Sequence, residues 1–169
     1  KSSDFSLSKL KQFDAVVCGA GHAGVEAALI LNRFKISTAL ITIDPLAIGR
    51  MSCNPAIGGL AKGQIVKEID VLGGIMGKAT DYSALQYKIL NKSKGKSVWS
   101  PRAQVDKRTY EGFINKTIKK GKYITVLQGE IVDIVTDNGV VMAAITRDGQ
   151  TIGCSTLILT CGTFLNGLV

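Results

Sequence analysis

FDAVVCGAGHAGVEAALILNRFKISTALITID, residues 13–44, is the stretch of this 169-residue chain that decides its fold. It opens on a mostly apolar run, residues 13–18, of the kind that forms a parallel strand buried on both faces. A glycine-rich turn follows at once, and residues 25–34 then carry apolar side chains at helical spacing. A second apolar run, residues 38–43, ends just before Asp44. This order of strand, turn, helix and strand predicts a βαβ unit.

Three glycines shape the turn between the first strand and the helix. Gly19 permits the tight turn, Gly21 lets the backbone approach a pyrophosphate, and Gly24 lets helix and strand pack closely. The N–H groups and the positive dipole end of the helix favour phosphate at this place. Asp44 stands 20 residues beyond Gly24 and can accept a hydrogen bond from a ribose hydroxyl. The alternative is a glycine turn used only for packing.

The rest of the chain alternates irregular segments with further predicted strands and helices. Turn signals at 137–139 and 148–149 divide the residues before the last predicted strand into a three-run β-meander. The other expected elements are an irregular Gly/Pro-rich loop over 45–63, a helix over 64–76 broken at Gly73–Gly74, a strand over 82–90, a basic loop over 91–97, a helix that starts at Ser100–Pro101 and stops at Gly121, and strands over 123–128 and 156–161. Together they predict an α/β fold with a parallel sheet, flanking helices and a meander.

Composition places the chain among globular proteins, with 46% hydrophobic and 20% charged residues. No apolar run reaches the roughly 18–20 residues that a membrane span needs. Residues 1–12 are polar and lack the apolar core of a secretory signal, so we interpret them as a short polar arm ahead of a domain over 13–169. The four cysteines have no paired spacing and His22 is the single histidine, which favours a reducing, cytoplasmic location and no metal site.

The chain is basic, with 21 Lys and Arg against 13 Asp and Glu and a net charge of +8. Much of the excess lies between Lys88 and Lys122. A basic stretch on an α/β domain favours a polyanionic partner, of which RNA and DNA are the commonest. A solvated surface with a biased charge explains the same composition, so charge alone leaves the two open.

The segment RMSCNPAIGGLAKG, residues 50–63, is the most specific piece of the sequence. With its continuation QIVKEIDVLGG, it resembles the MnmG (GidA) family of FAD-dependent tRNA uridine-modifying enzymes. The resemblance extends over nearly the whole chain through GAGHAGVEAA, SCNPAIGG, KGQIVKEID, LGGIMGKATD, ILNKSKGKSV, RAQVDK and LTCGTFLNG. A related FAD- and folate-dependent tRNA methyltransferase, TrmFO, shares the flavin fold, but SCNPAIGG favours MnmG.

The resemblance implies a Rossmann-like, glutathione-reductase-like FAD-binding domain. Family members are several times longer, so residues 13–169 are expected to be the N-terminal part of that domain, which is incomplete here and inactive alone. The glycine turn by itself does not separate NAD from FAD. The long loop after the second strand and the meander suit a flavoprotein better than an NAD-dependent dehydrogenase, and an ordinary NAD oxidoreductase stays as an alternative.

The resemblance also implies an activity for the full-length enzyme. In the family, reduced flavin and methylenetetrahydrofolate add an aminomethyl or carboxymethylaminomethyl group to C5 of the wobble uridine of certain tRNAs. The GTPase MnmE is the required partner, NADH re-reduces the flavin, and the enzyme is a homodimer. A non-catalytic module that binds tRNA or MnmE is the alternative.

Cofactor-binding residues follow from the resemblance, position by position. The pyrophosphate is expected to bind the loop Gly19, Ala20, Gly21, His22, Ala23 and Gly24. Asp44 is expected to contact the adenosine ribose, and the backbone of Ile131 the adenine. Thr160, Gly162 and Thr163 are expected to lie near the cofactor. Some relatives carry asparagine in place of Asp44. For His22, a residue of the first helical turn without chemistry of its own is the simpler interpretation.

Cys53 is the predicted catalytic residue. It lies in a glycine-rich loop, where backbone N–H groups lower the pKa of a thiol and stabilise a thiolate. The matching cysteine of the family is a candidate nucleophile for C6 of uridine, which would activate C5; a packing thiol is the alternative. Cys18, Cys154 and Cys161 fall in or beside apolar β runs and are expected to be core thiols.

The RNA-binding residues are predicted within two motifs, NKSKGKS and RAQVDK, which in the family contribute to the active-site floor and the tRNA surface. They are Lys92, Lys94, Lys96, Arg102, Lys107 and Arg108. Such residues contact phosphates and position the RNA without reading its sequence. Chemistry at C5 further requires the wobble base to leave its stack. The four lysines at 116–122 are explained by the helix dipole and by solubility.

Overall fold

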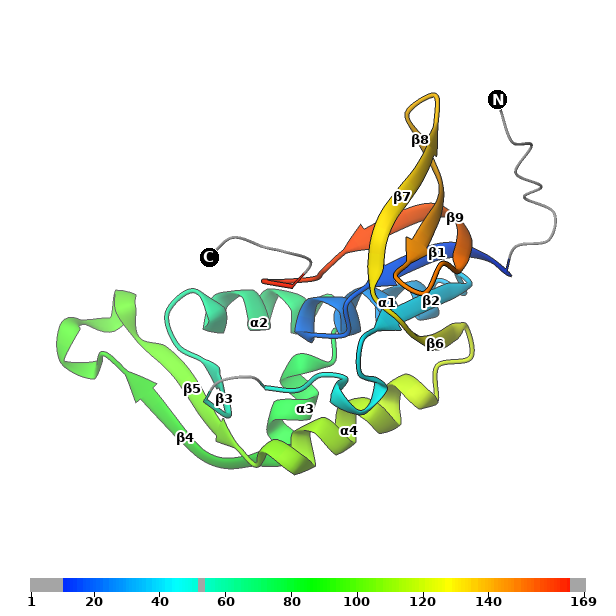
Figure 1. Ribbon diagram of the computed structural model, residues 1–169. Helices are drawn as coiled ribbons and strands as arrows, with labels where there is room; N and C mark the ends of the chain where they lie inside the picture. Colours follow the sequence, from blue (N-terminus) through cyan, green and yellow to red (C-terminus); the bar gives the residue numbers. More distant parts are fainter. Residues whose placement is uncertain (1–10, 52–53, 165–169) are drawn as a thin grey trace, which may run out of the picture. The chain divides into compact units, whose positions relative to one another are not determined.

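The computed structural model describes residues 11–51 and 54–164, and the chain forms two compact units. The first unit comprises residues 1–46 and 121–169, and the second unit comprises residues 47–120. The described part of the first unit contains the βαβ unit and the meander, and the second unit contains a small antiparallel sheet with three helices (Figure 1). Within the described residues, no helix combines the length and the apolar character needed to cross a membrane.

Parallel strands form one half of the sheet in the first unit. They are β1 (Lys11–Cys18), β2 (Thr38–Thr42), β6 (Ile124–Gln128) and β9 (Thr151–Leu159), within the sheet order β6-β2-β1-β9-β8-β7. Val17 of β1 lies opposite Leu40 of β2 and Ile158 of β9. Helix α1 (His22–Arg33) connects β1 to β2 and packs on these strands. The predicted βαβ unit is therefore confirmed, with β1 starting two residues earlier than expected.

The meander forms the other half of this sheet. Strand β7 (Ile131–Asp137) pairs antiparallel with β8 (Val140–Thr146), which pairs antiparallel with the first residues of β9. Asn138 and Gly139 both have positive φ, 48° and 79°, as a two-residue hairpin turn of this kind requires. The prediction of a separate last strand over 156–161 is wrong: the run that begins at Thr151 continues into it without a turn, so β9 pairs with both β8 and β1.

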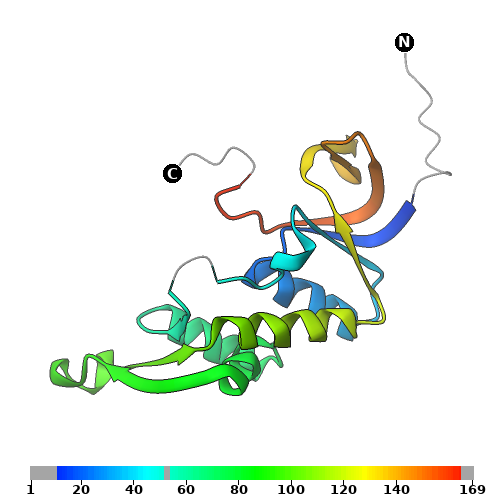
Figure 2. The same ribbon diagram turned by 60° about the horizontal axis from the view of Figure 1, so that its bottom comes forward.

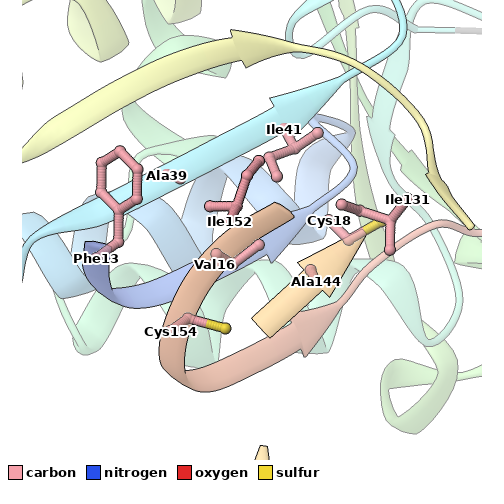
Figure 3. Close-up of a cluster of buried hydrophobic side chains, with 9 residues drawn as sticks. All are labelled: Phe13, Val16, Cys18, Ala39, Ile41, Ile131, Ala144, Ile152 and Cys154. Carbon is pink, nitrogen blue, oxygen red and sulfur yellow. The ribbon is translucent and has the colours of Figure 1, made fainter. Parts of the chain in front are cut away.

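Side chains from both halves of the sheet form a buried cluster (Figure 3). Its members come from β1, β2, β7, β8 and β9 and are Phe13, Val16, Cys18, Ala39, Ile41, Ile131, Ala144, Ile152 and Cys154. All nine are at most 8% exposed. Cys161 is partly buried and packs against them, so the prediction of core thiols is confirmed. The cluster buries side chains of the neighbouring strands β1 and β9, whose carboxyl ends lead into the Gly19 turn and to Thr160.

The second unit is built on a three-stranded antiparallel sheet with the order β3-β5-β4. Its elements are β3 (Ala56–Gly58), α2 (Lys62–Val71), α3 (Met76–Ser83), β4 (Ala84–Leu90), β5 (Ser100–Val105) and α4 (Lys107–Lys119). The predicted break at Gly73–Gly74 is confirmed, since it separates α2 from α3. In both views the β4–β5 hairpin extends beyond α3 and α4 of the same unit (Figures 1 and 2).

The predicted helix start at Ser100–Pro101 is wrong. These residues open β5, in which Ser100, Ala103 and Val105 are buried and pairing with β3 and β4 holds the backbone extended. Helix α4 starts at Lys107 instead, where the carboxylate of Asp106 accepts a hydrogen bond of 2.7 Å from the Thr109 backbone N–H. Aspartate caps a helix as well as serine does, and only Asp106 lies beyond the paired strand.

Candidate cofactor site and basic hairpin

In the turn after β1, Gly19 and Gly24 lie so close to neighbouring backbone atoms that neither position has room for a side chain. A Cβ at Gly24 would lie 1.8 Å from the carbonyl oxygen of Gly19, and a Cβ at Gly19 would lie 2.6 Å from the carbonyl oxygen of Thr160. Gly19 also has a φ of +98°, and its N–H donates to the carbonyl oxygen of Ile41 at 2.8 Å. Glycine at 19 and 24 is therefore required for packing the loop between β1, β2 and β9, as the sequence predicts.

Gly21 differs from these two glycines. Its φ of −70° and ψ of −170° suit any residue, and a Cβ built there would meet no described atom within 4 Å. Neither backbone conformation nor packing among the described residues requires glycine here, although glycine is a better N-cap than alanine. Gly21 is also the N-cap of α1, whose first turn contains no acidic residue. The space over Gly21 thus lies at a helix N-terminus, where N–H groups without intrahelical partners favour an anion.

Thr160 ties the loop to the end of β9. Its hydroxyl donates to the carbonyl oxygens of Cys18 at 2.8 Å and Gly19 at 3.0 Å, and its backbone N–H donates to Cys18 O at 2.8 Å. The predicted residue Thr160 therefore lies beside the glycine loop. Gly162 and Thr163 follow in an exposed turn, in which Gly162 has a φ of +61°.

Asp44 lies two residues after β2 and is half-buried. Its Oδ1 accepts a hydrogen bond of 2.8 Å from the Leu46 backbone N–H, and its carbonyl oxygen accepts one of 3.4 Å from the Thr42 hydroxyl. This local turn fixes the carboxylate at the carboxyl end of β2, the same edge of the sheet as the glycine loop. The position matches the one predicted for a ribose contact, which stays a prediction.

Ile131 is buried and begins β7, beside a cleft of about 310 Å³. The cleft is lined by Glu130, Ile131, Val132, Asp133, Ile134, Arg147 and Leu159. Glu130 and Arg147 form a two-point ion pair there, with 2.6 Å from Nε to Oε2 and 2.9 Å from the guanidinium Nη2 to Oε1. The Arg147 guanidinium lowers the pKa of Glu130, so the pair stays charged over the neutral range. No local sequence pattern indicates this pair, whose members are 17 residues apart.

The predicted catalytic residue, Cys53, lies outside the described residues. Of its surroundings the structure describes buried Met51 on one side and Asn54 on the other, where the carbonyl oxygen of Asn54 accepts from the Ala56 N–H at 2.7 Å. Among the described residues, no group of His, Cys, Asp and Glu could hold a metal ion. Burial raises the pKa of the Cys18 thiol to about 11 and also raises that of Cys154, so neither is poised as a nucleophile.

The predicted RNA-binding residues all belong to the second unit, in two groups. Lys92 and Lys94 lie in one short 3₁₀ turn and Lys96 in a second, both at the tip of the β4–β5 hairpin. Arg102 lies on β5 of the same hairpin. The other group, Lys107 and Arg108, occupies the first turn of α4, next to the Asp106 cap. The structure thus groups four of the six cations on one hairpin.

Comparison with known proteins identifies the family. The family model described as "Glucose inhibited division protein A" matches residues 14–169. The chain belongs to this GidA family. It is 49% identical over 163 residues to the tRNA uridine 5-carboxymethylaminomethyl modification enzyme MnmG of Thermodesulfovibrio yellowstonii and 48% identical over 158 residues to that of Aquifex aeolicus. These alignments cover 96% and 94% of the chain, but only 26% of either relative, so the chain spans about a quarter of their length.

Several solved structures share the fold of this chain. Aquifex aeolicus GidA superposes with a TM-score of 0.87 at 47% identity, over 92% of this chain and 26% of that one. The GidA-related protein of Thermus thermophilus gives 0.61 at 13% identity, over 90% of this chain and 54% of that one. The flavin-dependent brominase Bmp2 gives 0.58 at 18% identity, over 90% and 38%. The latter two show the fold alone, which is the Rossmann-like fold of FAD-binding domains that the sequence predicts.

Proposed function

We propose that this chain forms the pyrophosphate- and adenosine-binding part of an FAD site in a tRNA-modifying enzyme. The cofactor assignment rests on the open space beside Gly21. Its missing side chain serves neither the backbone conformation nor packing among the described residues, and the space lies at the N-terminus of α1. A pyrophosphate needs both features: room for its oxygens and N–H groups directed at them. The flavin-dependent enzymes with this fold and the MnmG relatives support FAD as the dinucleotide.

Different residues of the chain bind different parts of the cofactor. The loop from Gly19 to Gly24 holds the pyrophosphate through backbone N–H groups, and Asp44 accepts from the adenosine ribose. The backbone of Ile131 contacts the adenine at the edge of the neighbouring cleft. Thr160 keeps the loop closed against β9 through its two hydroxyl contacts. Bound FAD supplies the redox chemistry of the reaction.

The reaction we propose is addition of an aminomethyl or carboxymethylaminomethyl group to C5 of the wobble uridine of a tRNA. Methylenetetrahydrofolate supplies the methylene carbon, and an amine, ammonia or glycine, supplies the nitrogen. NADH keeps the flavin reduced, and the GTPase MnmE acts as partner of a homodimer in the cytoplasm. Cys53 adds as a thiolate to C6 of the uridine, which raises electron density at C5, and it is released when C5 loses its proton. The cations Lys92, Lys94, Lys96, Arg102, Lys107 and Arg108 contact the tRNA phosphates.

A Cys53→Ser variant of the intact protein tests this assignment. We expect tRNA isolated from cells that carry only this variant to lack the C5 modification in a nucleoside analysis by mass spectrometry. The purified variant should bind as much flavin as the unaltered protein, because Cys53 is not among the residues assigned to cofactor binding. Cys161→Ser is the matched control and should leave the modification in place. Full modification with Cys53→Ser would remove Cys53 from the mechanism.

A further inference from the structure

The β4–β5 hairpin carries positive charge without any compensating acid. Between Asp81 and Asp106 the sequence contains no aspartate or glutamate, while five cations are present: Lys88, Lys92, Lys94, Lys96 and Arg102. No carboxylate of the described residues forms an ion pair with any of the five. A surface that serves solubility alone intersperses both signs of charge, so this hairpin is suited to an anionic partner.

Strand pairing concentrates this charge further. Lys88 on β4 lies directly opposite Arg102 on β5. Like charges at opposed positions of an antiparallel pair destabilise the pairing. The neighbour of Arg102 on its other side is Gly58 of β3, which offers no counter-charge. An anion lying across this face would offset the repulsion between Lys88 and Arg102.

The hairpin also exposes two aromatic rings, Trp99 and Tyr87. Trp99 is 40% exposed, and its indole N–H donates to the carbonyl oxygen of Lys92 at 3.3 Å. Tyr87 is 61% exposed, and its hydroxyl donates to Asp81 at 2.8 Å. The hydrogen bond of Trp99 fixes its ring next to the turn that carries Lys92 and Lys94. A ring held in place at low entropic cost, next to a turn that carries lysines, is suited to stacking on a nucleobase.

We infer that the β4–β5 hairpin binds an unpaired segment of the tRNA, with one base stacked on Trp99 and the flanking phosphates contacted by Lys92, Lys94, Lys96 and Arg102. This inference rests on the proposed tRNA substrate. Stacking on a side chain requires an unstacked base, because the faces of paired bases in an A-form helix are covered by their neighbours. An acidic peptide would use the lysines but would gain little from the indole ring. The hairpin therefore recognises a loop rather than a stem.

The test compares Trp99→Leu with Trp99→Phe in the intact protein. Binding of a fluorescein-labelled anticodon stem-loop is measured by anisotropy, together with a fully paired duplex of the same length. Loss of one stacked base costs about 1–3 kcal/mol, so Trp99→Leu should weaken stem-loop binding by about 5- to 150-fold and leave duplex binding unchanged. Trp99→Phe should bind the stem-loop with most of the affinity of the unaltered protein. Phe34→Leu, at another exposed aromatic residue, is the control and should bind like the unaltered protein.

A salt titration separates stacking from charge. Replacing Lys92, Lys94 and Lys96 together by glutamine should lower the slope of log affinity against log salt by about 2, at about 0.7 per lost phosphate contact. Trp99→Leu should leave that slope unchanged. Equal stem-loop affinity of Trp99→Leu and the unaltered protein would overturn the inference and leave the proposed tRNA substrate intact. Absence of salt-dependent RNA binding by the unaltered protein would overturn both.

Discussion

Alanine at Gly21 and at Gly24 should have opposite consequences, although both glycines belong to the same loop. In Gly24→Ala the new Cβ would lie 1.8 Å from the carbonyl oxygen of Gly19, against 3.4 Å for ordinary contact, a deficit of about 1.6 Å. The carbonyl oxygen is a backbone atom and the Cβ is bonded directly to the backbone, so rotation of a side chain cannot relieve the overlap. Overpacking of this kind costs about 1–3 kcal/mol when it can relax, and we expect Gly24→Ala to lie at or above the upper end.

Gly21→Ala should leave the fold nearly unchanged. Alanine is a poorer N-cap than glycine by about 0.5–1 kcal/mol, but it also restricts the unfolded chain, which stabilises by about 0.4–1 kcal/mol where the native φ is allowed. The two effects should cancel to within about 0.5 kcal/mol. The new methyl group occupies the space proposed for the pyrophosphate, however, and a clash of about 1–3 kcal/mol weakens FAD binding by about 5- to 150-fold.

Two measurements on the intact protein separate these outcomes. Thermal denaturation of the flavin-free form should give a midpoint for Gly21→Ala close to that of the unaltered protein and a much lower one for Gly24→Ala. Titration with FAD, followed by quenching of flavin fluorescence, should then show the affinity loss in Gly21→Ala. Unchanged FAD affinity in a stable Gly21→Ala protein would refute the argument that this glycine makes room for the cofactor.

Three further predictions concern single residues, two in the first unit and one in the second. Thr160→Val removes the hydroxyl that donates to two carbonyl oxygens and should lower the free energy of unfolding in urea by about 0.5–1.5 kcal/mol, whereas Thr160→Ser should not. Burial raises the pKa of the Cys18 thiol from 9.0 to about 11, so between these pH values the folded state keeps a proton that the unfolded chain loses. The free energy of unfolding in urea should therefore fall from pH 9 to pH 11. The fall should be smaller in Cys18→Ala. Hydrogen bonds from Thr109 hold the pKa of Asp106 below 3.8, so the contribution of this cap is present above pH 3.8 and is lost as the pH falls further. Acid unfolding followed by circular dichroism should show a weaker pH dependence in Asp106→Asn, and an identical curve would contradict the role of the cap.

The βαβ unit could be predicted because its signals are local and agree with one another. The apolar run before Gly19, the spacing of the three glycines and the second apolar run all indicate the same fold. The different roles of Gly21 and Gly24 follow from the motif, but the distances at each glycine could not be predicted, since they depend on which atoms approach it. The contact of Thr160 with Cys18 joins residues 142 positions apart, and only the pairing of β1 with β9 brings them together.

The errors have the same origin. Ser100–Pro101 has the local chemistry of a helix start, but β4 pairs with these residues and β3 pairs with β5 from Arg102 onward, which holds the segment in a strand. The first residues of the last strand, Thr151–Gly153, also pair with β8, so this part has the pattern of a meander although it continues into the strand beside β1. The role of Trp99 could not be predicted, because the sequence shows its charged neighbours but neither its exposure nor its hydrogen bond to Lys92.

The central claim is that the glycine loop after β1 holds FAD, and the flavin content of the purified intact protein tests it most directly. The visible absorbance spectrum should show a protein-bound flavin, and denaturation should release FAD in a ratio of about one per chain, as one glycine loop per chain requires. If the protein is isolated without flavin, added FAD should be taken up. A protein that binds no FAD, or that binds NADH in preference to it, would contradict the account.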